Sequence, residues 1–240
     1  MKYEYRDCEI FYKYIDRKSD TTDVFLHGWG CDHTSLLFCK DLTKNSCLFV
    51  DFPPFGESGK RLPDWNVFTY ANMLIALCKK LRINRFNLVG HSFGGRIATI
   101  VSVLCKDETN ALVLVDSAGT KPRRSLSYYA KVGIYKLKKK LKMNVSKYGS
   151  CDYLALEPEM RKVFNSIVNT HLDEFLPYIK CDTLIVFGRD DQTTPIYMAK
   201  KLHRKIKNST LVILEDAGHF SFVDRKLEFS AVLKEFLLKR

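Results

Sequence analysis

Long apolar runs are missing from this sequence of 240 residues. The longest stretch without a charged residue, Trp65 to Cys78, has 14 residues and includes the polar Asn66, Thr69 and Asn72. A membrane-spanning helix needs about 18 to 20 consecutive apolar residues, so we expect none here. The N-terminus alternates charged and aromatic residues where a signal peptide would need an uninterrupted apolar segment. We therefore expect a cytoplasmic protein.

Closely spaced cysteines are also absent. The chain has no C-x-x-C pair and no cluster of cysteine and histidine at the spacing of zinc ligands. Cys78 and Cys105 lie inside apolar runs, where a free thiol packs as a small hydrophobic group. We therefore expect reduced, mostly buried cysteines and no structural metal ion; the eight are Cys8, Cys31, Cys39, Cys47, Cys78, Cys105, Cys151 and Cys181.

Acidic residues are missing from one segment only. Between Thr120 and Ser150 there are ten lysines and arginines and no acid. The other 209 residues contain 29 basic and 27 acidic residues, a net charge of +2, although the whole chain carries +12. The excess positive charge therefore belongs to this segment, and it does not indicate a nucleic-acid-binding domain.

What the chain does have is enough apolar sequence, 46% of its residues, to bury the core of a single α/β domain. Short, nearly continuous apolar runs alternate with longer helical patterns, and this order predicts a doubly wound, mostly parallel sheet flanked by helices. The charged and aromatic alternation from Lys2 to Asp16 predicts an antiparallel hairpin at the sheet edge. The expected strands are 23–27, 48–52, 86–91, 111–117, 183–188 and 210–215, and the expected helices are 32–45, 66–82, 92–106, 196–206 and 222–238.

One long stretch does not fit the alternation. From Lys121 to about Pro177 the sequence shows helical patterns without a strand, which is too long for a simple crossover connection. We expect a core domain made of residues 1–119 and 179–240, with residues 120–178 inserted as a helical cap over the site.

The third expected strand leads into the clearest catalytic signal. Residues Phe86 to Gly95 read FNLVGHSFGG, a strand followed by a G-x-S-x-G turn, and a helix begins near Arg96. A serine at a sharp turn from strand to helix needs small neighbours two residues away, and Gly90 and Gly94 supply them. The turn also places Ser92 at a helix N-terminus, which favours negative charge. Ser92 is therefore the expected nucleophile.

A serine nucleophile needs a histidine base that is oriented by a carboxylate. His219 is the strongest of six histidines because it follows the last strand, at the sheet edge where α/β proteins bind ligands. His27 and His91 flank the turns of the site and are expected to support or pack against it. The remaining three, His33, His171 and His203, are expected at the surface.

Four motifs in a fixed order resemble those of the α/β-hydrolase fold superfamily, in its group of capped, single-domain serine hydrolases. His27-Gly28-Trp29-Gly30 resembles the oxyanion loop, and Gly90 to Gly94 the nucleophile elbow. The acid loop corresponds to Gly188-x-x-Asp191-x-x-x-Pro195, and the histidine loop to Ala217-Gly218-His219-Phe220. This spacing favours Asp191 as the acid over its neighbour Asp190 and over Asp116, which ends the fourth expected parallel strand. A fifth segment, Asp51 to Ser58, has Pro54 where the family usually has glycine, so the local turn must differ.

The resemblance implies an α/β-hydrolase fold with a catalytic triad of Ser92, Asp191 and His219. It also implies that the backbone N–H groups of Trp29 and Phe93 stabilise the oxyanion. The expected function is cofactor-free serine hydrolysis of a carboxylic ester or a similar activated acyl compound. Two alternatives stay open: carbon–carbon bond hydrolysis by the same residues, and a ligand receptor on a hydrolase fold.

The basic segment also shows an amphipathic pattern. Leu126, Ala130, Ile134, Leu137 and Leu141 repeat at steps of three and four residues, with Lys131, Lys138, Lys139 and Lys142 outside their arc. The simpler interpretation is a solvated lysine-rich face. The alternative is that the helix attracts an anionic substrate or touches an anionic membrane surface.

Overall fold

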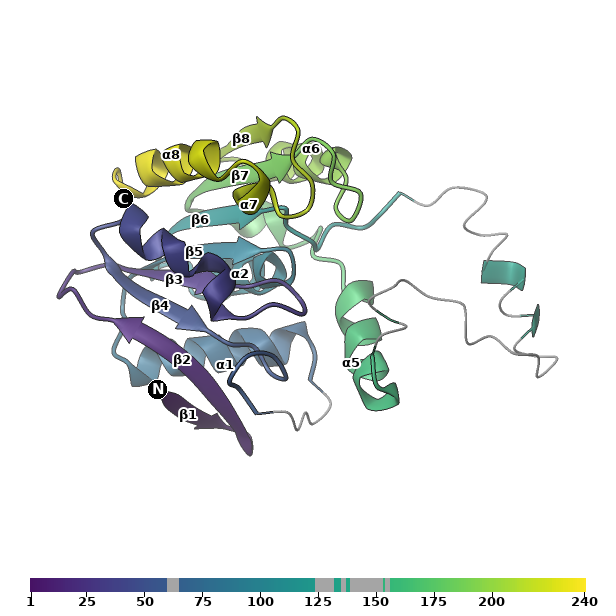
Figure 1. The fold of residues 1–240 in the computed structure, drawn as a ribbon, viewed down its shortest axis with the longest axis horizontal. Helices are drawn as coiled ribbons and strands as arrows, with labels where there is room; N and C mark the ends of the chain where they lie inside the picture. The colour runs from purple at the N-terminus through teal and green to yellow at the C-terminus, as the bar shows by residue number, and fades with distance from the viewer. Residues whose placement is uncertain (60–64, 124–131, 135–136, 139–152, 154–155) are drawn as a thin grey trace.

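The computed structural model describes residues 1–59, 65–123, 132–134, 137–138, 153 and 156–240. Its centre is an eight-stranded sheet with the strand order β1-β2-β4-β3-β5-β6-β7-β8 (Figure 1). The central strands are buried along their whole length, because helices cover both faces of the sheet. The strands are β1 (Lys2–Tyr5), β2 (Cys8–Ile15), β3 (Thr22–Leu26), β4 (Ser46–Val50), β5 (Phe86–His91), β6 (Thr109–Val115), β7 (Asp182–Gly188) and β8 (Ser209–Leu214).

The sheet is parallel from β4 to β8 and antiparallel only where the first two strands join its edge. In the antiparallel hairpin Tyr3 pairs with Ile10, which confirms the edge hairpin expected over residues 2–16. All six expected parallel strands are present with ends shifted by at most two residues. The predicted mostly parallel sheet flanked by helices is therefore confirmed.

The core forms two apolar layers, one on each face of the sheet. One layer contains the buried side of α1 (Val67–Lys80), α2 (Phe93–Leu104) and α6 (Ile196–Lys205). The other contains the 3-10 helix η1 (His33–Leu42), α7 (Ser221–Asp224) and α8 (Lys226–Leu237). Helix α1 begins with a capping box in which the Asn66 side chain accepts from the backbone N–H of Thr69.

Two expected helices differ from the structure. The segment expected as a helix over 32–45 is the 3-10 helix η1, whose first backbone N–H groups donate to the Asp51 and Asp32 carboxylates. The last expected helix, 222–238, is divided at Arg225, whose φ of −123° and ψ of 53° are not helical. No helix in the described part of the chain has both the length and the apolar character needed to span a membrane.

Part of the segment expected as a cap is described. Helix α5 (Pro158–Asn169) lies beside the carboxyl ends of the strands, and the short 3-10 helix η2 (Leu176–Tyr178) returns the chain to β7 (Figure 1). Val163 and Ile167 of α5 are buried in the same apolar layer as α1 and α2. Most of the predicted basic amphipathic helix, including Leu126, Ala130, Lys131, Lys139, Lys140, Leu141 and Lys142, lies outside the described residues.

Candidate active site

Ser92 sits on a strained turn between β5 and α2. Its φ of 49° and ψ of −106° lie outside the regions that non-glycine residues usually adopt. The two glycines of the motif are needed for space. A Cβ at Gly90 would lie 2.6 Å from the carbonyl oxygen of Gly94, and a Cβ at Gly94 would overlap the backbone of Leu26 in β3. The turn therefore holds the Ser92 side chain away from the sheet, at the start of α2.

The structure brings the three expected triad side chains together at the carboxyl edge of the sheet. Ser92 Oγ lies 2.9 Å from His219 Nε2, and His219 Nδ1 lies 2.8 Å from Asp191 Oδ2. A carboxylate beside Nδ1 favours the tautomer with the proton on Nδ1, which leaves Nε2 free to accept the serine proton. The geometry of a nucleophile, a base and an orienting acid is present.

Asp191 is buried in a set of hydrogen bonds that favour its charged form. Its Oδ1 accepts from the backbone N–H groups of Thr193 and Thr194 at 2.7 and 2.9 Å, and its Oδ2 accepts from the Thr194 hydroxyl at 2.6 Å. Burial alone would raise its pKa, but the hydrogen bonds from His219 and Thr194 hold the pKa below its ordinary value. Asp191 is therefore ionised at neutral pH.

Asp116, the other carboxylate considered for this role, makes its hydrogen bonds to Gly188 and Ser221 and none to His219. Its Oδ1 accepts from the backbone N–H of Gly188 at 2.8 Å, and its Oδ2 accepts from the Ser221 N–H and hydroxyl at 3.1 and 2.6 Å. Burial raises its pKa to about 7 in spite of these hydrogen bonds. Asp116 thus ties the end of β7 to the start of α7, which directly follows the loop that carries His219. Asp190, also considered, is exposed beside Asp191.

His91 supports the loop of the expected base. It is fully buried, and its Nε2 lies 2.8 Å from the backbone carbonyl oxygen of His219. Since a carbonyl can only accept, the neutral His91 carries its proton on Nε2. Burial and the nearby His219 lower the pKa of His91 to about 3. His27 Nε2 accepts a hydrogen bond from the backbone N–H of Phe52. His27 therefore also has the supporting role that the sequence predicted.

Two of the three histidines expected at the surface are placed differently, since His171 is half-buried and His33 is not exposed either. His33 is largely buried, and its Nδ1 lies 3.0 Å from both carboxylate oxygens of Asp51. The same carboxylate accepts from the Glu57 backbone N–H, so Asp51 organises the loop after β4. In that loop the Pro53–Pro54 peptide bond is cis and the positive φ is at Gly56. His203 is exposed as expected, with its Nδ1 2.9 Å from the Ser209 hydroxyl.

The expected oxyanion donors lie next to the nucleophile. Phe93 is the first residue of α2, and Trp29 lies on the loop after β3. Neither backbone N–H donates a hydrogen bond to any described residue. Both N–H groups thus lack an acceptor among the described residues, and their role as oxyanion donors stays a prediction.

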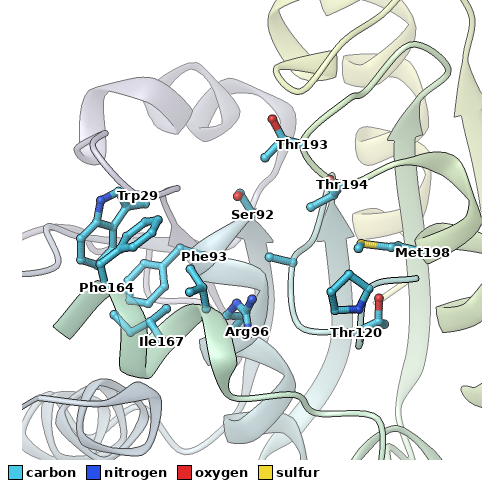
Figure 2. A pocket seen from close by; sticks show the side chains of 13 residues that line it. Trp29, Ser92, Phe93, Arg96, Thr120, Phe164, Ile167, Thr193, Thr194 and Met198 are labelled. Atoms are coloured by element: carbon cyan, nitrogen blue, oxygen red, sulfur yellow. The ribbon is translucent and has the colours of Figure 1, made fainter. Parts of the chain in front are cut away.

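A cavity of about 250 Å³ opens at Ser92 (Figure 2). The Trp29 and Phe93 rings line it, 5.6 Å apart, and Phe164 of α5 packs 5.3 Å from Trp29 on the same side. Residues 118–122, which follow β6, line another part. Helix α5 of the expected cap thus contributes to the wall of the cavity.

Sequence reasoning named only Trp29, Ser92 and Phe93 among the residues that line this cavity, and Arg96 is the charged residue that it missed. Arg96 lies on α2, four residues after Ser92, and lines the cavity although its side chain is largely buried. No motif marks it, because an arginine in the first turn of a helix is common on protein surfaces. Among the described residues, no group of three or more histidine, cysteine or acidic side chains could hold a metal ion.

The chain is similar to known hydrolases over most of its length. The model of the alpha/beta hydrolase family matches residues 24–232. The chain is 26% identical to the AB hydrolase superfamily protein YisY of Bacillus subtilis (strain 168), over 89% of this chain and 90% of that protein. It is 24% identical to a proline iminopeptidase of Lactobacillus crispatus (strain ST1), over 98% of this chain and 97% of that protein. The solved enol-lactonase from Burkholderia xenovorans LB400 has a TM-score of 0.77 and 20% identity, over 99% of this chain and 100% of that one. The family match extends from β3 to α8 and includes Ser92, Asp191 and His219.

Proposed function

Since this chain belongs to the alpha/beta hydrolase family, we propose that it is a serine hydrolase that cleaves a carboxylic ester or a similarly activated acyl compound. The observation that carries the proposal is the chain of two hydrogen bonds from Ser92 Oγ through His219 to Asp191. Its reactive end faces the cavity that Trp29 and Phe93 line. The proposed roles are nucleophile for Ser92, base for His219 and orienting acid for Asp191.

The reaction begins when Ser92 Oγ attacks the acyl carbon and His219 Nε2 takes the hydroxyl proton. The carbonyl oxygen becomes an oxyanion, which accepts hydrogen bonds from the backbone N–H groups of Trp29 and Phe93. The imidazolium of His219 is stabilised by Asp191. It then protonates the leaving alcohol as the ester bond breaks, and an acyl group remains on Ser92.

Water completes the cycle. His219 Nε2 takes a proton from a water molecule, whose oxygen attacks the acyl-enzyme carbon. The second tetrahedral intermediate collapses, the proton returns to Ser92 Oγ, and the carboxylic acid leaves. Each proton that His219 accepts leaves it again within the same half-reaction, first to the alcohol and then to Ser92, so no cofactor enters the balance.

Labelling with a fluorophosphonate probe tests the nucleophile. The unaltered protein should react with the probe and hydrolyse short activated esters, whereas Ser92→Ala should lose labelling and lose about 10⁶-fold in turnover. A matched control is Ser102→Ala, because Ser102 is buried on the same helix and its hydroxyl donates only to the Thr99 carbonyl. That variant should label normally.

The same experiment separates the alternatives. An unaltered protein that is labelled but cleaves only a dienoic or β-diketone acid, and no ester, would favour carbon–carbon bond hydrolysis. A folded protein that neither reacts with the probe nor turns over any acyl compound would contradict the proposal and favour a ligand receptor. Labelling that persists in Ser92→Ala would show that another residue is the nucleophile.

A further inference from the structure

Arg96 is a buried cation without a described counter-ion. Its side chain is 7% exposed, and burial lowers its pKa only to about 10, so the guanidinium stays charged at neutral pH. Within the described residues it makes no ion pair and one hydrogen bond, from Nη1 to the Thr170 carbonyl oxygen at 2.5 Å. A guanidinium has five N–H donors, and buried charges in proteins are normally paired. Among the described residues, most of its hydrogen-bonding capacity therefore has no partner.

A second polar group at this part of the cavity lacks a partner. The Thr120 side chain is buried, and its hydroxyl makes no hydrogen bond with any described residue. Thr120 follows Gly119, where a Cβ would lie 3.5 Å from Cγ of Arg96. Both Thr120 and Arg96 line the cavity that contains Ser92 (Figure 2). A hydroxyl without a partner and a guanidinium without a counter-ion, both judged among the described residues, thus line the same cavity.

The rest of this part of the wall is apolar, with Pro122, Ile167, Val168 and Met198 as lining residues. The sequence from Thr120 to Ser150 contains no acidic residue, so this segment supplies no carboxylate to Arg96. Apolar surroundings strengthen the attraction between a guanidinium and an anion, because water screens it less. The surroundings of Arg96 therefore suit a bound anion.

We propose that the cavity recognises a substrate that carries a carboxylate, which pairs with the Arg96 guanidinium and accepts from the Thr120 hydroxyl while Ser92 attacks the acyl carbon. This inference rests on the proposed hydrolase function and specifies its substrate class. A carboxylate matches a guanidinium in shape, since two parallel N–H groups can donate to its two oxygens. Its single charge is neutralised by the single cation, whereas a phosphate monoester would bring about two negative charges.

The size of the cavity and the placement of Arg96 limit the ligand. A volume of about 250 Å³ is at the small end for ligand sites, so the ligand is a small compound. Ser92 and Arg96 are separated by one helical turn, about 6 Å along the axis at about 1.5 Å per residue. The carboxylate therefore lies a few atoms from the bond that is cleaved.

Matched pairs of esters test the proposal. One series consists of aryl monoesters of succinic, glutaric and adipic acid, each compared with the aryl ester of the neutral straight-chain acid of equal carbon number. A second series places the charge on the alcohol, as in 4-acetoxybenzoate compared with its methyl ester. We expect at least one charged ester to exceed its neutral partner in kcat/KM by about 10- to 100-fold, the range for hydrogen bonds to a charged group.

Variants show whether Arg96 causes that preference. Arg96→Met should lower kcat/KM for the preferred charged ester by about 10- to 100-fold and leave its neutral partner within about threefold. Thr120→Val should lower kcat/KM by about 3- to 10-fold for the charged ester and leave kcat/KM for the neutral ester unchanged. The matched control Arg204→Met removes an exposed arginine of α6, outside the cavity, and should change neither ester.

A purely structural role for Arg96, anchoring the end of α5 through Thr170, predicts a different result. Arg96→Met would then lower the melting temperature and slow both esters of each pair equally. If this variant does not fold, inhibition of the unaltered protein keeps the test open, because glutarate should inhibit at least tenfold more strongly than glutaramide, its neutral diamide. Equal rates within every pair, together with equal inhibition by glutarate and glutaramide, would overturn the proposal. The hydrolase proposal would survive that result as long as the protein is labelled by the fluorophosphonate probe and cleaves neutral esters. It fails only if both labelling and ester cleavage are absent.

Discussion

The two buried carboxylates near His219 should respond in opposite ways to the same change. Asp191→Asn replaces the oxygen that faces His219 Nδ1, at 2.8 Å, with either an amide NH₂ or a weaker acceptor. An NH₂ group beside Nδ1 favours the tautomer with its proton on Nε2, which can no longer accept the proton of Ser92. We expect kcat to fall by about 10⁴-fold, as in other triads with this change.

Folding should hardly change in Asp191→Asn. The amide oxygen can still accept from the backbone N–H groups of Thr193 and Thr194, and the Thr194 hydroxyl can rotate to accept from the new NH₂. No buried donor is left without an acceptor. The free energy of unfolding should therefore change by less than about 1 kcal/mol.

Asp116→Asn should show the reverse pattern. An amide oxygen can keep the hydrogen bond from the Gly188 N–H, but the NH₂ group then faces the Ser221 N–H, which loses its acceptor. One orphaned buried donor costs about 1 to 3 kcal/mol. At about 2 to 4 °C per kcal/mol for a chain of this size, the melting temperature should fall by about 2 to 12 °C. Because Asp116 makes no hydrogen bond with His219, we expect kcat to fall by less than about tenfold.

Two measurements on each variant decide the matter: kcat with an activated ester, and the melting temperature by circular dichroism or calorimetry. The reasoning predicts an active but less stable Asp116→Asn and a stable but inactive Asp191→Asn. It would be refuted if folded Asp116→Asn had the lower kcat, because the acid that orients His219 would then be misassigned.

Two further predictions concern residues that support the site. His91 keeps a neutral ring in the folded protein down to about pH 3, whereas an unfolded histidine gains a proton near its ordinary pKa of 6.5, so its contribution to stability is lost as the pH falls through this window. His91→Gln removes this titration. In urea unfolding between pH 6 and 4, the difference in the free energy of unfolding between the two proteins should change by about 1.4 kcal/mol per pH unit. A difference that stays constant with pH would contradict the buried neutral ring. Gly94→Ala would force a Cβ into the Leu26 backbone and should destabilise by at least about 1 to 3 kcal/mol, while Gly133→Ala, with nothing within 4 Å of its Cβ, should stay within about 0.5 kcal/mol. Equal melting temperatures for the two alanine variants would mean that the turn can relax without cost.

The parallel strands and the elbow could be predicted from the sequence because each rests on a local rule. A strand covered on both faces is mostly apolar and does not alternate with polar residues. The strands from Phe86 to His91 and from Thr183 to Gly188 follow this rule, with a few small or polar residues among the apolar ones. The elbow depends on glycines at fixed positions, and the close approach between Gly90 and Gly94 confirms the reason for that spacing. Chain order then selected Asp191 and His219, and the structure places both beside Ser92.

The features that were missed depend on contacts between distant segments. An apolar pattern does not distinguish hydrogen bonds to the third residue from those to the fourth, so the 3-10 helix at 33–42 was expected as an ordinary helix. His33 gave no sign of a partner, because Asp51, 18 residues away, reaches it only after β3 and β4 pair side by side. The role of Asp116 in joining Gly188 to Ser221 likewise needs β6, β7 and α7 to be in place.

The environment of Arg96 is set by segments far away in the sequence, so its proposed binding role could not be predicted from the sequence of its own helix. On an isolated helix, a residue four positions after the N-cap serine lies on the same face as that serine, and an arginine there would extend into water. In the folded chain, residues 118–122 after β6 and residues 164–168 of α5 close around that face, so the guanidinium is enclosed with Ser92 instead of being solvated. The segments that bury the cation supply apolar side chains and a threonine hydroxyl but no described acid to pair with it. Burial without a partner is costly for a charge. It is reasonable in a binding site, where the missing partner is the ligand, and this is why the preference for a carboxylate should disappear with Arg96 alone.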